Sequence, residues 1–180
     1  MKNKKTERIV MAIAAVFVLL CLCFVFRNNI PNSSNKKATE REMPVADDVS
    51  VELVKGVMIS QEFENDIDTI ENIAIVFTKF YREAHGKVTF QLLNENGIIF
   101  SQSLDASEIP EQHRVFFTPL NPLTNLSGRT LTIRIFAESE DNDGVAIMIK
   151  TEGVSDTKIR TNDSEIDGTL CFRINDKKDQ

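Results

Sequence analysis

Residues 51–175 alternate between apolar and polar side chains with a period of two, in short segments separated by turn residues. In the clearest segment, 128–139, Leu131, Ile133 and Ile135 point to one side and polar residues to the other. Successive side chains of a β-strand point to opposite faces, so this period predicts strands that bury one face. Very little helix is expected in this part of the chain.

About eight strands are predicted, each bounded by glycine, proline, asparagine or aspartate. They are 54–63, 70–81, 86–93, 98–105, 114–120, 128–139, 144–153 and 168–175. The segment 70–81 is apolar on both faces and should be a central strand. Asn96-Gly97, between two alternating runs, predicts a hairpin. The expected fold is all-β: an antiparallel β-sandwich or jelly roll, with a closed barrel as the alternative.

Ahead of the strands, residues 9–26 form an uninterrupted apolar run of eighteen residues. A helix of that length covers about 27 Å, close to the hydrocarbon thickness of a bilayer. The run is too long for a typical signal-peptide core and has no small-x-small cleavage site after it, so one transmembrane signal anchor is predicted. Basic residues flank it on both sides, but those in 1–8 are more tightly clustered. This favours a cytoplasmic N-terminus and an extracytoplasmic domain.

Charge divides the chain into a basic and an acidic part. Residues 1–44 carry eight Lys or Arg and three acidic residues. Residues 45–180 carry thirteen Lys or Arg and twenty-four acidic residues, a net charge of −11. So acidic a domain is a poor candidate for binding nucleic acid. Between them, residues 27–48 are polar with two prolines and predict a flexible stalk. The domain is placed at 49–176, with a tail at 177–180.

Neither the cysteines nor the histidines indicate a reactive or metal site. Cys171 is the only cysteine of the domain and is interpreted as a half-buried small hydrophobe. His85 and His113 have no ligands at zinc spacing. The chain also lacks a G-x-S-x-G elbow, a P-loop, an H-E-x-x-H motif and a G-x-G-x-x-G motif. The protein is therefore predicted not to be an enzyme.

The succession of strand and turn motifs over residues 55–150 resembles the galactose-binding-like jelly-roll domains of bacterial membrane and cell-surface proteins. The matching positions are Ile59-Gln61-Phe63, Tyr81-Arg82, Gly86 to Leu92, Asn96-Gly97, Phe116 to Leu120 and Gly128 to Ile135. Members of that family bind sugars, lipids or proteins. The resemblance thus implies a binding module at the cell envelope.

Two sets of residues are candidates for a site. Sugar sites commonly use a flat aromatic face, and this chain has no tryptophan and one tyrosine. Tyr81, Arg82 and Phe116 are therefore the candidate ligand-binding residues, with core packing as the competing interpretation of the aromatic ones. The oxygen-rich loops suggest structural calcium as the only candidate cofactor. Its candidate ligands are Glu62, Glu64, Asp66, Glu140, Asp141 and Asp143, and plain solvated turns are the competing interpretation.

The preferred functional hypothesis is a membrane-anchored, extracytoplasmic interaction module that recognises an envelope glycan or a protein partner. The alternative is a non-catalytic accessory subunit. In that case the helix at 9–26 would pair with a larger membrane protein and the sandwich would act as a structural cap.

Overall fold

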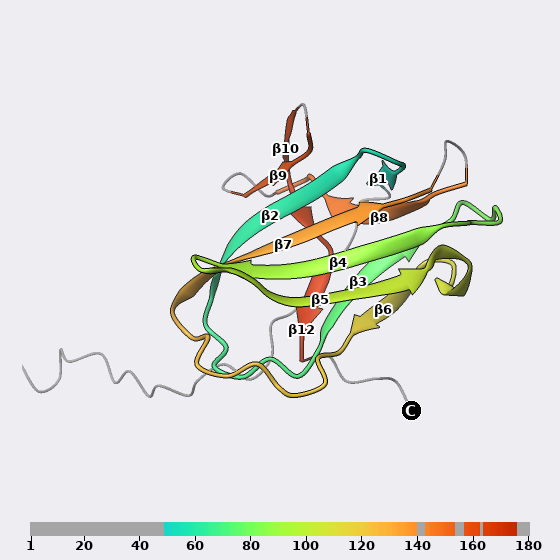
Figure 1. The fold of residues 1–180 in the computed structure, drawn as a ribbon. Coiled ribbons are helices and arrows are strands. Elements are labelled where there is room, and N and C mark those ends of the chain that lie inside the picture. Colours follow the sequence, from blue (N-terminus) through green and yellow to red (C-terminus); the bar gives the residue numbers. More distant parts are fainter. Residues whose placement is uncertain (1–48, 140–142, 154–156, 163, 176–180) are drawn as a thin grey trace, which may run out of the picture. The chain divides into compact units, whose positions relative to one another are not determined.

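The computed structural model describes residues 49–139, 143–153, 157–162 and 164–175 (Figure 1). The predicted basic head, membrane anchor, stalk and tail lie outside these residues. Within the described part of the chain, no helix is long and apolar enough to cross a membrane.

The described residues form two antiparallel sheets of six strands each, which confirms the all-β prediction. The sheet around β3, here the β3 sheet, contains β1 (Val49–Leu53), β8 (Val145–Lys150), β3 (Ile73–Thr78) and β12 (Phe172–Ile174), with β11 (Thr169–Leu170) beside β8 and β6 (His113–Phe117) beside β3. The β7 sheet has the order β10 (Glu165–Asp167), β9 (Lys158–Arg160), β2 (Met58–Asn65), β7 (Arg129–Ala137), β4 (Lys87–Asn94) and β5 (Gly97–Asp105). One 3-10 turn, η1 (Ala106–Glu108), follows β5.

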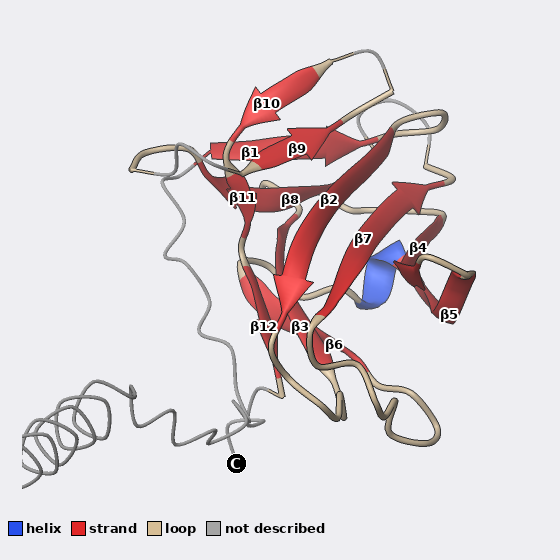
Figure 2. Ribbon diagram, turned by 90° about the vertical axis from the view of Figure 1, so that its left-hand side faces the viewer, coloured by secondary structure: helices blue, strands red, loops and turns tan. Residues whose placement is uncertain are grey.

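The core lies between the inner faces of the two sheets (Figure 2). Burial alternates along β7 as the sequence predicted, with Leu131, Ile133 and Ile135 fully buried. Two aromatic contacts join the sheets. Phe90 of β4 stacks on Phe117 of β6, with ring centroids 4.5 Å apart, and Phe63 of β2 meets Phe172 of β12 at 5.0 Å. These contacts, together with the aliphatic side chains around them, hold the two layers together.

The prediction of a central strand at 70–81 is confirmed, because β3 pairs with β6, β12 and β8. Its outward residue Ala74 is as fully buried as the inward Ile75. Strand β8 is also buried on both faces from Val145 to Ile149. A strand enclosed on both faces has no need for polar alternation, which explains its continuous apolar sequence.

The structure has more strands than the sequence pattern predicted. Strands β1, β9 and β10 were not expected, because their three to five residues are too few to show a clear period. The predicted closing strand 168–175 is divided at Cys171 into β11 and β12. At that point the Cys171 N–H donates to Met148 and its carbonyl accepts from Val76. Cys171 is fully buried, deeper than the half-buried position predicted.

The predicted hairpin joins β4 to β5, with Asn94 opposite Gly97 across a two-residue turn. Gly97 has a φ of 116°, a conformation that favours glycine. The register shifts between Leu92 and Leu93, which leaves Ile99 as the extra residue of a β-bulge. Strand β5 is paired only with β4 among the described strands and forms one edge of the β7 sheet.

Candidate binding surface

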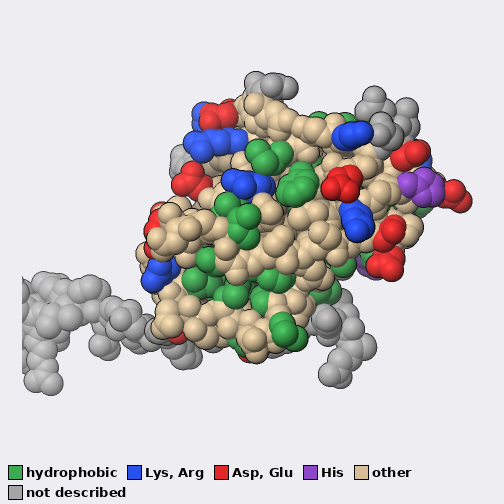
Figure 3. Space-filling model, viewed as in Figure 1, with side chains coloured by type: hydrophobic (Ala, Val, Ile, Leu, Met, Phe, Trp, Pro, Cys, Tyr) green, Lys and Arg blue, Asp and Glu red, His purple; other side chains and the backbone are tan. Residues whose placement is uncertain are grey.

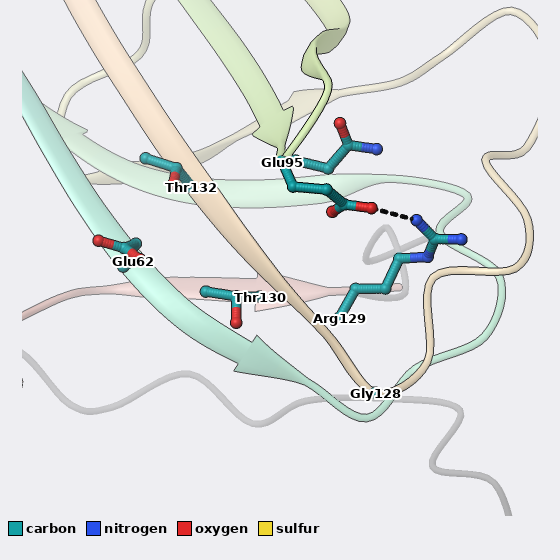
Figure 4. A pocket seen from close by; sticks show the side chains of 7 residues that line it. Glu62, Glu95, Gly128, Arg129, Thr130 and Thr132 are labelled. Atoms are coloured by element: carbon teal, nitrogen blue, oxygen red, sulfur yellow. Dashed lines mark hydrogen bonds and ion pairs between the residues drawn. The ribbon is translucent and has the colours of Figure 1, made fainter.

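The outer face of the β7 sheet carries a shallow polar depression over β2, β7 and the β4–β5 turn (Figure 4). Its volume is about 590 Å³, and it is lined by Glu62, Asn94, Glu95, Gly128, Arg129, Thr130 and Thr132. A second depression of about 240 Å³ shares Glu62 and Thr132 and continues over β9, where Ser60, Thr157, Lys158 and Arg160 complete its lining. The two together are called the polar trough. Figure 3 shows this face, on which acidic, basic and hydrophobic side chains are interspersed.

Strand pairing brings the trough residues together. Glu62 of β2 lies opposite Thr132 of β7, and Glu64 lies opposite Thr130. Since the neighbours Phe63 and Leu131 point into the core, these polar side chains must point outward. The Thr130 hydroxyl donates to Glu64 at 2.8 Å, which orients Thr130, one of the residues that line the trough.

At one end of the trough, Arg129 is held in a defined orientation. Its Nη1 donates to Glu95 at 2.6 Å and its Nε donates to the Asn125 carbonyl at 2.9 Å. Both charged side chains are about half exposed, at 41% and 58%, so this pair adds little to stability. Its main effect is to place a guanidinium and a carboxylate side by side at the surface.

At the other end, β9 and β10 contribute a small ion-pair network. Arg160 reaches Glu62 at 3.4 Å and Glu165 at 3.1 Å, and Lys158 reaches Glu165 at 3.0 Å. Hydrogen bonds from Lys158 and Arg160 lower the pKa of Glu165, and the same bond to Glu165 raises the pKa of Lys158. The trough therefore presents fixed charges of both signs at neutral pH, separated by threonine hydroxyls.

The sequence-predicted ligand residues lie elsewhere, on the β3 sheet and the turn that follows β3. Tyr81 is 84% exposed at that turn, and Arg82 beside it pairs with Glu52 at 2.7 Å. Phe116 lies opposite Ala74 in β6. Ala74 comes four residues before the end of β3, so Phe116 is displaced from the turn by about 13 Å along the strand. The structure thus brings Tyr81 and Arg82 together but places Phe116 apart from them.

The turn after β3 has an unusual backbone. Phe80 and Tyr81 have φ values of 54° and 58°, and bulky residues rarely adopt this left-handed conformation. The Arg82 guanidinium lies over the Phe80 ring, 5.2 Å from its centroid. Two exposed aromatic side chains are therefore displayed on a strained turn that neighbouring groups hold in place.

Glu111, which the sequence analysis did not single out, is one of those groups. Its carboxylate accepts hydrogen bonds from the Thr78 hydroxyl, from the Lys79 N–H at 2.8 Å and from the Tyr81 N–H at 3.2 Å. Burial acts to raise the pKa of Glu111, but these three bonds outweigh it and the pKa lies below its ordinary value. No local motif signals this role, because the contacts cross some thirty residues of sequence.

Replacing Glu111 with glutamine is expected to lower the free energy of unfolding by about 1–2 kcal/mol at neutral pH, because charge-assisted bonds to the turn are lost. The folded-state pKa is lowered, so this contribution is fully present above the ordinary value of 4.5 and is lost as the pH falls through the lowered folded-state pKa. Urea unfolding followed by circular dichroism at neutral and acidic pH measures it. A difference between wild type and Glu111→Gln that persists unchanged at acidic pH would contradict this account.

The candidate calcium ligands are only partly described. Glu62 is paired with Arg160, Glu64 accepts from Thr130, and Asp66 and Asp143 are exposed. Glu140 and Asp141 lie outside the described residues. In the ranges that the structure describes, no group of three or more His, Cys, Asp or Glu side chains is arranged to hold a metal ion. Calcium binding by this chain stays a prediction.

Comparisons with known proteins add no family assignment. The chain matches no protein-family model, and no curated protein matches it in a sequence search. The galactose-binding-like resemblance therefore rests on the order of motifs in the sequence.

Proposed function

We propose that this chain is a non-catalytic binding module, tethered to a membrane by residues 9–26, and that its polar trough recognises a glycan of the cell envelope. The observation that carries the proposal is the trough itself. It is a concave, polar surface built on rigid strands, with an arginine already oriented by two hydrogen bonds.

The lining suits a ligand rich in hydroxyl groups. A carboxylate such as Glu95 accepts hydrogen bonds from adjacent hydroxyls, and the Arg129 guanidinium donates to oxygen atoms in a fixed plane. The Thr132 hydroxyl can donate and accept, and the Thr130 hydroxyl, which donates its proton to Glu64, can accept. Since the trough mixes both charge signs, a neutral or zwitterionic oligosaccharide fits it better than a polyanion does.

Two sequence features support the remainder of the proposal. The apolar run at 9–26 is long enough to anchor the domain in a bilayer. The motif order resembles galactose-binding-like jelly rolls, and a jelly roll is compatible with the two antiparallel sheets. Tyr81 and Arg82, on the turn after β3, are candidates for a separate contact with the same ligand.

The test is an oligosaccharide array followed by calorimetry with the full-length chain in detergent. For the glycan that binds, Arg129→Met is expected to weaken affinity by about 10- to 100-fold, because a charge-assisted donor is lost. Thr132→Val, which keeps shape and strand propensity, should weaken it by roughly fivefold.

The matched control is Thr89→Val, which removes a hydroxyl from β4 on the same sheet, where Thr89 bonds Ser103 rather than lining the trough. It should bind as the wild type does. An array without any binder, or an equal loss in the Thr89→Val and Thr132→Val variants, would refute the glycan proposal.

A further inference from the structure

The described sheet edges differ sharply in how they are protected against pairing with another strand. Strand β10 has only three residues, and two of them are Glu165 and Asp167. Strand β1 carries Glu52, and β6 begins with His113 and Arg114. Short length and charged side chains are the usual means by which proteins prevent edge-to-edge association.

Strand β5 is neither short nor charged, and its β-bulge at Ile99 lies outside the five residues from Phe100 to Leu104. It is nine residues long, and from Gly97 to Leu104 it contains no charged residue and no proline. Among the described strands it pairs only with β4. The backbone N–H and C=O groups on its other side therefore point away from the sheet. Ile98, at the start of the strand, is 53% exposed. In a domain with a net charge of −11, so long an uncharged edge calls for an explanation.

The side chains of β5 are arranged symmetrically around Gln102. Phe100 and Leu104 are half-buried and pack against the core from the edge, whereas Ser101 and Ser103 are exposed on the other face. Gln102 is oriented by a hydrogen bond that its Oε1 accepts from the Thr118 N–H at 3.0 Å. Read in either direction, the segment is apolar, serine, glutamine, serine, apolar.

We propose that β5 pairs antiparallel with β5 of a second copy of this chain, centred on Gln102. In this register Phe100 lies opposite the partner's Leu104, Ser101 lies opposite the partner's Ser103, and the two Gln102 residues face each other. Phe100 and Leu104 of each copy are then covered by the same residues of the other copy. Asp105 lies opposite the partner's Ile99, so no acidic side chain faces another acidic side chain. This self-complementarity favours a second copy over an unrelated peptide.

The pairing would join two six-stranded β7 sheets into one continuous sheet. The two-fold axis of an antiparallel strand pair is perpendicular to the sheet, so both polar troughs would open on the same side. A single strand pair buries less surface than a standard stable interface, so the dimer should be weak and concentration-dependent. Two troughs on one side would strengthen binding to a repetitive ligand through avidity.

The experiment is sedimentation velocity with the full-length chain in detergent, over a wide range of concentrations. Wild type should shift reversibly from monomer to dimer. The double variants Ser101→Lys/Ser103→Lys and Ser101→Glu/Ser103→Glu place like charges directly opposite each other across the proposed interface. Each should therefore raise the dissociation constant by about tenfold or more. An equimolar mixture of the two should recover the dimer, because every lysine then faces a glutamate.

The control Asn121→Lys/Thr124→Lys adds the same charge at exposed positions of the β6–β7 loop and should dimerise as wild type. Circular dichroism checks that all variants remain folded. A chain that is monomeric throughout would overturn the proposal. So would a dimer that the charge variants leave unchanged, which would place the contact elsewhere, for example at residues 9–26. Failure of the mixture to recover the dimer would exclude the antiparallel register.

Discussion

Phe90→Ala is expected to lower the free energy of unfolding by about 3–5 kcal/mol, the largest effect of a single substitution that we predict. Phe90 is fully buried. The centroid of its ring lies 4.5 Å from that of Phe117 in the opposite sheet and 5.8 Å from that of Phe100. Its removal leaves a cavity between the sheets that the surrounding strands can fill only partly. Small domains are stable by about 5–15 kcal/mol, so this loss is a large fraction of the total.

Urea unfolding followed by circular dichroism measures the change. The matched control is Phe80→Ala, which removes the same side chain from the turn after β3, where it is 47% exposed. That variant should change stability by no more than about 1 kcal/mol. Equal losses of stability in the two variants would contradict the conclusion that the buried contact between Phe90 and Phe117 helps to hold the two sheets together.

The second large effect is expected for Asn65→Asp, which changes one buried atom with almost no change in shape. The Asn65 amide nitrogen donates to the Ile67 carbonyl at 2.7 Å and to the Leu126 carbonyl at 2.8 Å, and the side chain is only 2% exposed. A carboxylate cannot donate these bonds and would face two carbonyl oxygens in a buried site. We expect a loss of roughly 3 kcal/mol at neutral pH.

The pH dependence of this variant identifies the cause. The Ile67 N–H can still donate to the introduced carboxyl group, as it does to Asn65 Oδ1 at 3.3 Å. Burial and the two facing carbonyl oxygens nevertheless raise the pKa of that group above its unfolded value, so the folded state binds the proton more tightly than the unfolded state does. Part of the lost stability should therefore return as the pH falls through the raised pKa. Asn121→Asp, at an exposed loop position, is the control and should show neither effect. A loss in Asn65→Asp that does not change with pH would point to a rearranged backbone instead.

Asn65 also connects the core to the polar trough. Besides its side-chain bonds, its carbonyl accepts from the Gly128 N–H at 2.7 Å, and Gly128 directly precedes Arg129. The loop that precedes Arg129 is thus attached to the end of β2 by two hydrogen bonds to one residue, from Asn65 to Leu126 and from Gly128 to Asn65. The Asn65→Asp variant should accordingly lose glycan affinity as well as stability, if the trough is the binding site.

Local sequence determined most of the strands and one turn. Leu131, Ile133 and Ile135 alternate with polar residues, and that period alone assigns the inner and outer faces of β7. The continuous apolar sequence of 73–77 identified β3 as central, and Asn96-Gly97 located the hairpin between β4 and β5. These are features of neighbouring residues, so they can be read without knowing which strands pair.

Tertiary structure alone decided which of these strands lie side by side, and therefore where a site can form. Glu62, Glu95 and Arg129 are far apart in sequence and meet because β2 and β4 both pair with β7. The Glu111 contacts with the turn after β3, and the position of Phe116 away from Tyr81, follow from the pairing of β3 with β6. Side-chain periodicity encodes which face of a strand is buried, but strand order is set by the packing of the whole chain. For that reason the fold class could be predicted from the sequence, whereas the polar trough and the uncharged β5 edge could not.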